Sequence, residues 1–231
     1  KELPDYLNSD LPVIVNIAAN TVEEFGKLAS YLCENDFSQL IDGIEINVSC
    51  PNIKKGGIAF GIEPTQVERI VKIVKKNIES RMIVITKLTP NITDITLPAR
   101  AAIEGGTDAL SMINTLRAMA IDINTGRPYL GNKIGGLSGP AIKPVGLFMV
   151  YECFEKIPEC NNRKVPIIGI GGVSNWRDVI EYIMVGATAV GIGTAWFVNQ
   201  DVFIEIYKGI SKYVSENNTT ITDLIGKAHE A

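Results

Sequence analysis

The chain has 231 residues, of which 46% are hydrophobic and 21% charged, as expected for a globular protein of one large or two small domains. A net charge of −4 argues against a nucleic-acid or membrane-surface binder, because such proteins carry a basic stripe. No apolar stretch approaches the ~20 residues of a membrane-spanning helix, and residues 1–5 lack the pattern of a signal peptide. The four cysteines form no CxxC pair. We therefore expect reduced thiols in the cytoplasm, and neither a zinc site nor an Fe–S cluster built by this chain alone.

Six short apolar runs of strand length recur along the chain, separated by stretches with helical periodicity. The runs are continuous rather than alternating, which is typical of strands buried on both faces of a parallel sheet. This alternation of strand and helix predicts an α/β fold, either an open doubly wound sheet or a closed (β/α)8 TIM barrel. We expect strands at Val13–Ile17, Ile44–Val48, Ile83–Lys87, Ala109–Ile113, Val165–Ile170 and Ala189–Ile192, and helices at Val22–Asn35, Thr65–Ile78, Ile95–Glu104, Lys143–Ile157 and Trp176–Val185.

Two features favour the barrel. Polar residues and glycines follow nearly every strand, as expected when all the loops of a site share one face. The last two runs also end in glycine-rich turns, Gly169–Gly172 and Gly191–Thr194, which is the pattern of a phosphate site after strands seven and eight. If the last two runs are strands seven and eight of a barrel, the six runs are its strands three to eight. We then expect one barrel domain over residues 1–231, with the first two βα units absent.

The glycine turns place Gly171, Gly172, Gly193 and Thr194 where a phosphate would bind. Glycines let backbone N–H groups approach a phosphate closely, and a following helix N-terminus adds a favourable field. The chain has no GxxxxGK[ST] loop and no early GxGxxG followed by an acidic residue, so FMN fits better than ATP or NAD. The alternative is that these glycines serve only the geometry of the turns.

The segment Asn47–Asn52 follows the second run and contains two carboxamides, a hydroxyl and a thiol. The only histidine, His229, is two residues from the C-terminus, so Cys50 is the best-placed proton acceptor for chemistry near neutral pH. A thiolate base needs a lowered pKa or proton transfer that is coupled to substrate binding. The structural alternative is a cysteine that is simply buried. The next segment, Lys54–Gly61, has the glycine content of a mobile lid.

Carboxamides recur at the strand ends. Asparagine is uncommon in strands and costly to bury without partners. Their convergence predicts a ligand with alternating amide donors and acceptors, such as a pyrimidinedione or the edge of a flavin ring. Lys87 ends another strand and could stabilise negative charge on a reduced flavin, the alternative being an ion pair at the rim. The carboxamides concerned are Asn16, Asn47, Asn52 and Asn114.

The run Glu45-Ile46-Asn47-Val48-Ser49-Cys50-Pro51-Asn52 resembles the active-site segment of class 1 dihydroorotate dehydrogenases. The stretch Gly135–Pro140, followed by Ile142-Lys143-Pro144, is similar to the NAD-linked class 1B branch. Further similar segments lie at Lys87–Asn91, Ile113–Thr115, Ile168–Val173 and Gly193-Thr194.

The resemblance implies an FMN enzyme that oxidises dihydroorotate to orotate in pyrimidine biosynthesis. Cys50 would remove the proton at C5 of the substrate while hydride passes from C6 to flavin N5. The residues implied for the substrate are Asn47, Asn52, Asn114 and Thr115. Those implied for FMN are Asn16, Asn47 and Lys87 at the ring and ribityl chain, Ile113, Ser138 and Gly139 near the cofactor, and Gly171, Gly172, Gly193 and Thr194 at the phosphate.

The resemblance also implies partners. Class 1B proteins pair with a second subunit that carries FAD and a 2Fe–2S cluster, so either a homodimer or a heterotetramer is expected. Three alternatives stay open: a pyrimidine reductase similar to the corresponding domain of dihydropyrimidine dehydrogenase, a non-catalytic FMN-binding barrel, and an FMN-free phosphate-binding isomerase barrel. The last would explain the glycine turns but not the thiol or the carboxamides.

Overall fold

The computed structural model describes residues 11–34, 38–49, 51–52 and 58–230. The chain forms two compact units. The first comprises Lys1–Leu88, Asp94–Ser111 and Ile157–Pro166, and the second comprises Thr89–Thr93, Met112–Lys156 and Ile167–Ala231. The single domain expected over residues 1–231 stays a prediction.

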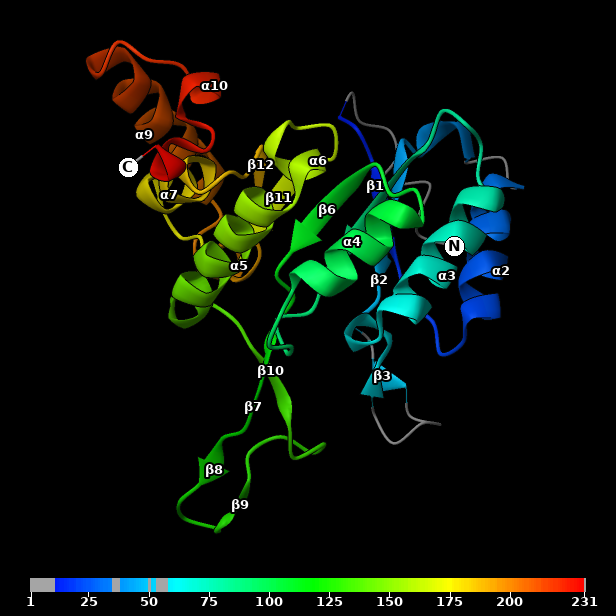
Figure 1. Cartoon of the computed structure of the whole chain (residues 1–231). Helices are drawn as coiled ribbons and strands as arrows, with labels where there is room; N and C mark the ends of the chain where they lie inside the picture. Colours follow the sequence, from blue (N-terminus) through cyan, green and yellow to red (C-terminus); the bar gives the residue numbers. More distant parts are fainter. Residues whose placement is uncertain (1–10, 35–37, 50, 53–57, 231) are drawn as a thin grey trace. The chain divides into compact units, whose positions relative to one another are not determined.

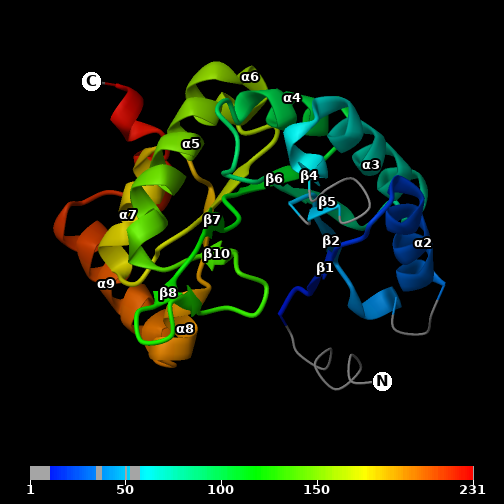
Figure 2. The ribbon, with the colours of Figure 1, turned by 90° about the horizontal axis from the view of Figure 1, so that it is seen from below.

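The first unit is built on parallel strands in the order β1-β2-β5-β6. Helices α2, α3 and α4 lie along one face of these strands (Figure 2). After β2 the chain forms the short antiparallel pair β3–β4. The elements are β1 (Ile14–Ile17), α2 (Val22–Cys33), η1 (Ser38–Leu40), β2 (Gly43–Asn47), β3 (Pro51–Asn52), β4 (Ile58–Ala59), η3 (Phe60–Ile62), α3 (Pro64–Lys76), β5 (Ile83–Lys87), α4 (Thr96–Glu104), β6 (Ala109–Met112) and α6 (Pro158–Asn161).

Alternation along the strands separates a core face from a polar face in this unit. In β2, Ile44 and Ile46 are fully buried, whereas the alternating residues Glu45 and Asn47 are only partly buried. Successive side chains of a strand point to opposite faces, so the isoleucines pack under the helices and the polar pair lies on the other side. Helix α3 contributes an apolar stripe of Val67, Ile70, Val71 and Val74, all fully buried.

The second unit contains the parallel pair β11–β12 with helices packed around it. Asn175 caps α7 through a capping box in which its side chain and that of Asp178 each accept a backbone N–H. The elements are η4 (Pro140–Ile142), α5 (Lys143–Lys156), β11 (Ile167–Ile170), α7 (Trp176–Met184), β12 (Ala189–Gly191), α8 (Thr194–Val198), α9 (Val202–Glu216), α10 (Ile221–Leu224) and η5 (Lys227–His229).

An arm of two antiparallel ladders extends from the second unit (Figure 1). Strand β7 (Leu116–Ala118) pairs with β10 (Gly135–Leu137), and β8 (Ile121–Asp122) pairs with β9 (Arg127–Pro128). The arm has exposed apolar side chains, among them Met119, Ile121, Ile123 and Tyr129.

The predicted strands and helices are confirmed within two or three residues at each end. The parallel α/β class is therefore confirmed, whereas closure into an eight-stranded barrel stays a prediction. Helix α9 and the strands of the arm were not predicted, because α9 buries only Val202 and Ile206 and the arm strands have two or three residues each. Within the described ranges, no helix has the length and hydropathy needed to cross a membrane.

A glycine on α5 provides the room for the largest fully buried side chain. A Cβ at Gly146 would overlap the hydroxyl of Tyr182, whereas a Cβ at Gly131 would meet nothing within 4 Å. We expect Gly146→Ala to lower the free energy of unfolding by about 1–3 kcal/mol through overpacking. The matched variant Gly131→Ala should change it by less than about 0.5 kcal/mol. Urea unfolding of both variants checks this, and equal stabilities would contradict the packing argument.

Candidate functional site

Five polar side chains lie on one face of the strands in the first unit, toward their carboxyl ends. The register pairs Asn16 with Glu45, Asn47 with Lys87, and Lys87 with Ser111. Paired residues of parallel strands share a face, as do residues two apart on one strand. We call Asn16, Glu45, Asn47, Lys87 and Ser111 the strand-end cluster. The structure thus brings together three predicted ligand residues, Asn16, Asn47 and Lys87.

Glu45 is the centre of this cluster. Its Oε2 accepts a hydrogen bond from Asn16 Nδ2 at 2.5 Å and lies 3.5 Å from Lys87 Nζ. Its Oε1 accepts a hydrogen bond from the Ser111 hydroxyl at 2.7 Å. Neither Glu45 nor Ser111 was predicted as a site residue. The available signal was an ionisable residue inside an apolar strand, since a buried charge requires partners.

Asn47 shapes the chain where β2 ends. Its Oδ1 accepts the backbone N–H of Ser49 at 3.1 Å, the Asx-type bond that lets an asparagine stabilise a turn. The predicted base Cys50 lies outside the described residues. The backbone of Asn52 pairs with that of Ile58, but the structure does not describe the Asn52 side chain. The roles expected for Cys50 and Asn52 therefore stay predictions.

In the second unit, Asn114 and Thr115 lie at the base of the arm. The Asn114 Oδ1 accepts the backbone N–H of Thr115 at 2.8 Å. Asn91 holds the same segment from the side, because its Nδ2 donates to the Thr115 carbonyl at 3.1 Å and its Oδ1 accepts from Arg117 N at 2.8 Å. Asn91 was not predicted as a site residue, and its role is to position the predicted pair.

In the second unit, residues predicted for the FMN phosphate lie beside two others predicted near the cofactor, Ser138 and Gly139. The Thr194 hydroxyl donates to the Ser138 hydroxyl at 2.8 Å. A Cβ at Gly172 would lie 2.8 Å from the Gly139 carbonyl oxygen. Both glycines have positive φ, +70° and +84°, which disfavours other residues. We call Ser138, Gly139, Gly171, Gly172, Gly193 and Thr194 the glycine–hydroxyl cluster.

Tyr182 supports this cluster from the core. Its hydroxyl donates to the Gly171 carbonyl at 2.8 Å, and a Cβ at Gly171 would lie 3.3 Å from the Ile113 side chain. Burial raises the pKa of Tyr182, so the hydroxyl remains a donor throughout the ordinary pH range. Ile113, a predicted cofactor neighbour, is itself buried and donates its backbone N–H to the Ile170 carbonyl at 2.8 Å. The glycine turn is thus held by backbone and side-chain bonds.

A partly buried group of ion pairs fixes the start of α5. Lys143 Nζ lies 2.7 Å from Asp178 Oδ1 and 2.8 Å from Glu181 Oε2, and hydrogen bonds to these two groups raise the pKa of Lys143. Burial alone would raise the pKa of Asp178, but the hydrogen bonds from Lys143 and Ser174 outweigh it and the pKa is lowered. Since a Cβ at Gly172 would lie 2.9 Å from the backbone nitrogen of Lys143, the pair stabilises one wall of the glycine–hydroxyl cluster.

The described cysteines are packing residues. Cys153 and Cys160 are buried, and Cys33 lies 3.7 Å from the sulfur of Met82. Burial raises the pKa of the Cys160 thiol to about 12, with Glu159 adding to the rise and Arg100 opposing it. His229 stacks on Tyr151 with ring centroids 3.9 Å apart. Over the described part of the chain, no group of three His, Cys, Asp or Glu residues is placed to hold a metal ion.

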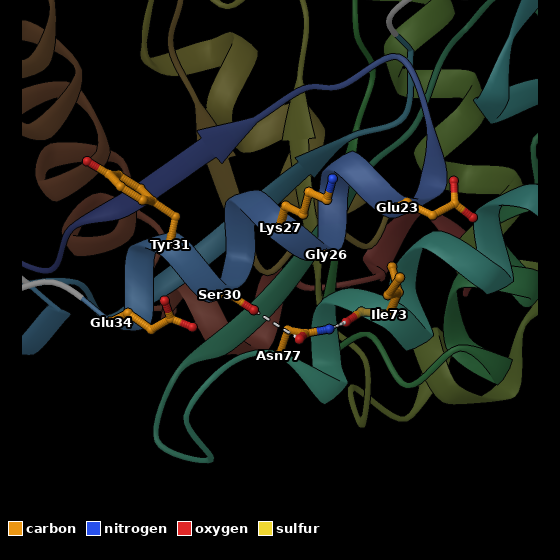
Figure 3. Close-up of a pocket in the computed structure, with 8 residues that line it drawn as sticks. All are labelled: Glu23, Gly26, Lys27, Ser30, Tyr31, Glu34, Ile73 and Asn77. Carbon is orange, nitrogen blue, oxygen red and sulfur yellow. Dashed lines mark hydrogen bonds between the residues drawn. The ribbon is translucent and has the colours of Figure 1, made fainter.

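A shallow groove lies between α2 and α3 (Figure 3). Two of its polar side chains are hydrogen-bonded within it, because the Ser30 hydroxyl donates to Asn77 Oδ1 at 3.0 Å and Asn77 Nδ2 donates to the Ile73 carbonyl at 2.7 Å. The two helices cover one face of the strands (Figure 2). Strand alternation places the strand-end cluster on the other face, so the groove is separate from that cluster.

Parallel strands with polar side chains at their carboxyl ends, together with strand-to-helix glycine turns, are typical of α/β enzymes, whose ligands bind at the strand ends. A family model described as dihydroorotate dehydrogenase matches residues 1–214.

The chain is 50% identical over 227 residues to the catalytic subunit of dihydroorotate dehydrogenase B (NAD(+)) from Thermoanaerobacter sp. (strain X514), covering 98% of this chain and 71% of that protein. The protein of the same name from Geobacter sp. (strain M21) is 46% identical over the same coverage. The one from Alkaliphilus oremlandii is 48% identical, over 94% of this chain and 68% of that protein. The chain belongs to the dihydroorotate dehydrogenase family and is an oxidoreductase.

The raised pKa of Cys160 predicts a specific loss of stability at high pH. Between about 9, the ordinary thiol value, and about 12, the unfolded chain releases this proton while the native protein keeps it. The stabilisation is thus complete below the unfolded pKa and is lost as the pH rises through the native one. We expect the unfolding free energy to fall more steeply with pH in the wild type than in Cys160→Ala, by up to ~1.4 kcal/mol per pH unit. Urea unfolding at several pH values measures the difference, and parallel curves would contradict the burial of this thiol.

Proposed function

We propose that the protein is the catalytic subunit of an NAD-linked dihydroorotate dehydrogenase and oxidises dihydroorotate to orotate in pyrimidine biosynthesis. The observation that carries the proposal is 46–50% identity to catalytic subunits of that name over 98% of the chain. The strand-end and glycine–hydroxyl clusters support it, because they place amide, ammonium, hydroxyl and backbone groups at strand ends.

The residues of the second unit fit the phosphate of FMN. A Cβ at Gly172 would lie 2.8 Å from the Gly139 carbonyl oxygen, so the absence of a side chain lets these two backbone segments pack against each other. A Cβ at Gly193 would meet nothing within 4 Å, which leaves its backbone accessible to a ligand. With the Thr194 hydrogen on the Ser138 oxygen, the Ser138 hydroxyl keeps its own hydrogen for a phosphate oxygen, and the Thr194 hydroxyl can rotate toward a second one when the ligand binds. Phosphate oxygens accept from such groups and from backbone N–H. When bound, FMN supplies the acceptor for the hydride that leaves C6 of the substrate.

The strand-end cluster fits the polar edge of the flavin ring. Asn16 and Asn47 carry both amide donors and acceptors, which match an imide edge. Lys87 provides a fixed positive charge beside them, and such a charge stabilises negative charge that develops during the reaction. The support for these roles is the shared face and the hydrogen bonds of the three residues.

Cys50 is the proposed base for the proton at C5 of the substrate. The described thiols of Cys153 and Cys160 are buried, and a pKa of about 12 makes Cys160 a poor source of thiolate. Asn47 shapes the turn that leads to Cys50. We assign the binding of the substrate carboxylate and ring amides to Asn47, Asn52, Asn114 and Thr115.

We further propose that the six parallel strands occupy positions three to eight of a (β/α)8 barrel. The glycine turns after β11 and β12 support this numbering, since phosphate sites of such barrels follow strands seven and eight. We also propose a partner subunit with FAD and a 2Fe–2S cluster. The relatives' description as catalytic subunits supports a partner.

The proposed function is tested with the purified holoprotein. We expect bound FMN, bleaching of its visible absorbance by dihydroorotate under anaerobic conditions, and release of orotate. Dihydrouracil should not reduce the flavin. Absence of flavin together with failure to bind added FMN would disprove the proposal, and preferential reduction by dihydrouracil would favour a dihydropyrimidine dehydrogenase-like enzyme.

The role of Cys50 predicts the effect of one substitution. In Cys50→Ser the rate of flavin reduction by dihydroorotate should fall by roughly 10² or more, because serine is a far weaker base near neutral pH. FMN should remain bound. Cys33→Ser is the control, since Cys33 contacts Met82 in the core, and it should reduce at the wild-type rate. Stopped-flow absorbance measures both, and an unchanged rate in Cys50→Ser would remove Cys50 from the mechanism.

The phosphate role of Thr194 is tested by comparing two ligands. Thr194→Val keeps the side-chain shape but removes a hydroxyl donor, and a hydrogen bond to a charged group contributes about 1.5–3 kcal/mol. We expect FMN affinity to fall by roughly 10- to 100-fold and riboflavin affinity to stay unchanged. Thr219→Val, on an exposed loop of the same unit, is the control. Titration of the apoprotein followed by flavin fluorescence gives both affinities, and an equal loss for both ligands would contradict the phosphate assignment.

A further inference from the structure

The Glu45 carboxylate has a central place in the strand-end cluster that the proposed function does not use. Its side chain is 15% exposed, and both oxygens have partners. Two of these partners, Asn16 and Lys87, are the residues assigned to the flavin ring. The third partner, Ser111, is fully buried, and its hydroxyl donates a hydrogen bond that fixes the Glu45 carboxylate.

We propose that Glu45 is a positioning residue of the flavin site that acts through Asn16 and Lys87. It fixes the orientation of the Asn16 amide and sets how much of the Lys87 charge acts on the ring. This inference rests on the proposed function, because it requires FMN bound at the strand-end cluster.

The Glu45 carboxylate orients the Asn16 amide. An ionised carboxylate only accepts hydrogen bonds, so Asn16 must turn its NH2 group toward Glu45, as the 2.5 Å contact shows. The Oδ1 atom lies on the other side of the planar amide and is therefore directed away from Glu45. Asn16 thus presents an acceptor that suits the N–H of an imide edge. A neutral amide at position 45 could donate or accept, and would permit either orientation of Asn16.

The Glu45 carboxylate also acts on the charge of Lys87. Its ammonium lies 3.5 Å from Glu45 Oε2, and the side chains of the pair are 22% and 15% exposed, so water screens their interaction only in part. The carboxylate compensates the positive charge. Because a reduced flavin carries more electron density than an oxidised one, loss of the carboxylate should strengthen the preference of Lys87 for the reduced form.

The core does not explain the carboxylate. Glu45 lies on the strand face opposite the helices, between the fully buried Ile44 and Ile46 that pack beneath them. A partly buried charge is costly unless its partners are fixed. Here a buried hydroxyl, a carboxamide and an ammonium are arranged around it on three different strands. This is the arrangement expected of a group that orients ligand-binding side chains.

The test is the flavin midpoint potential of the holoprotein carrying Glu45→Gln. We expect a more positive potential, and a tenfold gain in preference for reduced flavin corresponds to about 30 mV for this two-electron couple. Glu68→Gln is the matched control, because Glu68 also pairs with a lysine, Lys72, but on the outer surface of α3. It should leave the potential unchanged.

A double-mutant cycle separates positioning from a general structural effect. In a Lys87→Met background, Glu45→Gln should shift the potential by less than a third of its effect in the wild type, because the ammonium through which it acts is gone. A shift of equal size in both backgrounds, or no shift in the wild type, would overturn the inference. If Glu45→Gln does not fold, Glu45→Asp keeps the charge but withdraws it by one methylene and should shift the potential in the same direction, and an unchanged potential there would also overturn it.

Failure of the role proposed for Glu45 is distinguishable from failure of the proposed function. A wild-type protein that binds no FMN would disprove the function itself. A wild-type protein that binds FMN, with a potential that Glu45→Gln does not change, would disprove only the role of Glu45.

Discussion

The two-residue repeat of a parallel strand is the constraint on which the functional part of the first unit depends. Each strand sends alternate side chains to opposite faces, so Ile44 and Ile46 can bind the helices to the sheet while Glu45 and Asn47 point to the other side. The in-register pairing of β1, β2, β5 and β6 then brings polar groups from four strands together without any loop. The helix-covered strands therefore hold the strand-end cluster, the proposed ligand-binding groups, more firmly than a loop could.

In the second unit the proposed ligand contacts come from backbone and hydroxyl groups rather than from charged strand side chains. There the important positions lack side chains, and Tyr182 fills the space behind them. The two units thus offer complementary chemistry. One presents amides and charges on strand side chains, and the other presents hydroxyls and backbone around glycines.

Much of the fold could be predicted because continuous apolar runs are a strong signal for strands of a parallel sheet. The same signal concealed Glu45, which reads as an interruption of the run Ile44–Val48 until its three partners on neighbouring strands are seen. Pairing between distant strands is not contained in local periodicity. The supporting roles of Asn91 and Tyr182 were hidden for a similar reason, because each acts on a backbone carbonyl whose position depends on the fold. The glycine turns are visible in the sequence itself, since close backbone approach requires glycine, whereas their phosphate role stays a prediction.

The packing of Tyr182 also limits how this sequence can change over evolutionary time. Its ring occupies space at Gly169, and its hydroxyl occupies space at Gly146, so neither glycine can acquire even a methyl group while the tyrosine is present. Loss of the tyrosine alone would leave a void and an unsatisfied carbonyl at Gly171. Single substitutions at any of these positions are therefore disfavoured, and paired exchanges of large for small residues are the accessible route. Aligned relatives should show these three sites varying together or not at all.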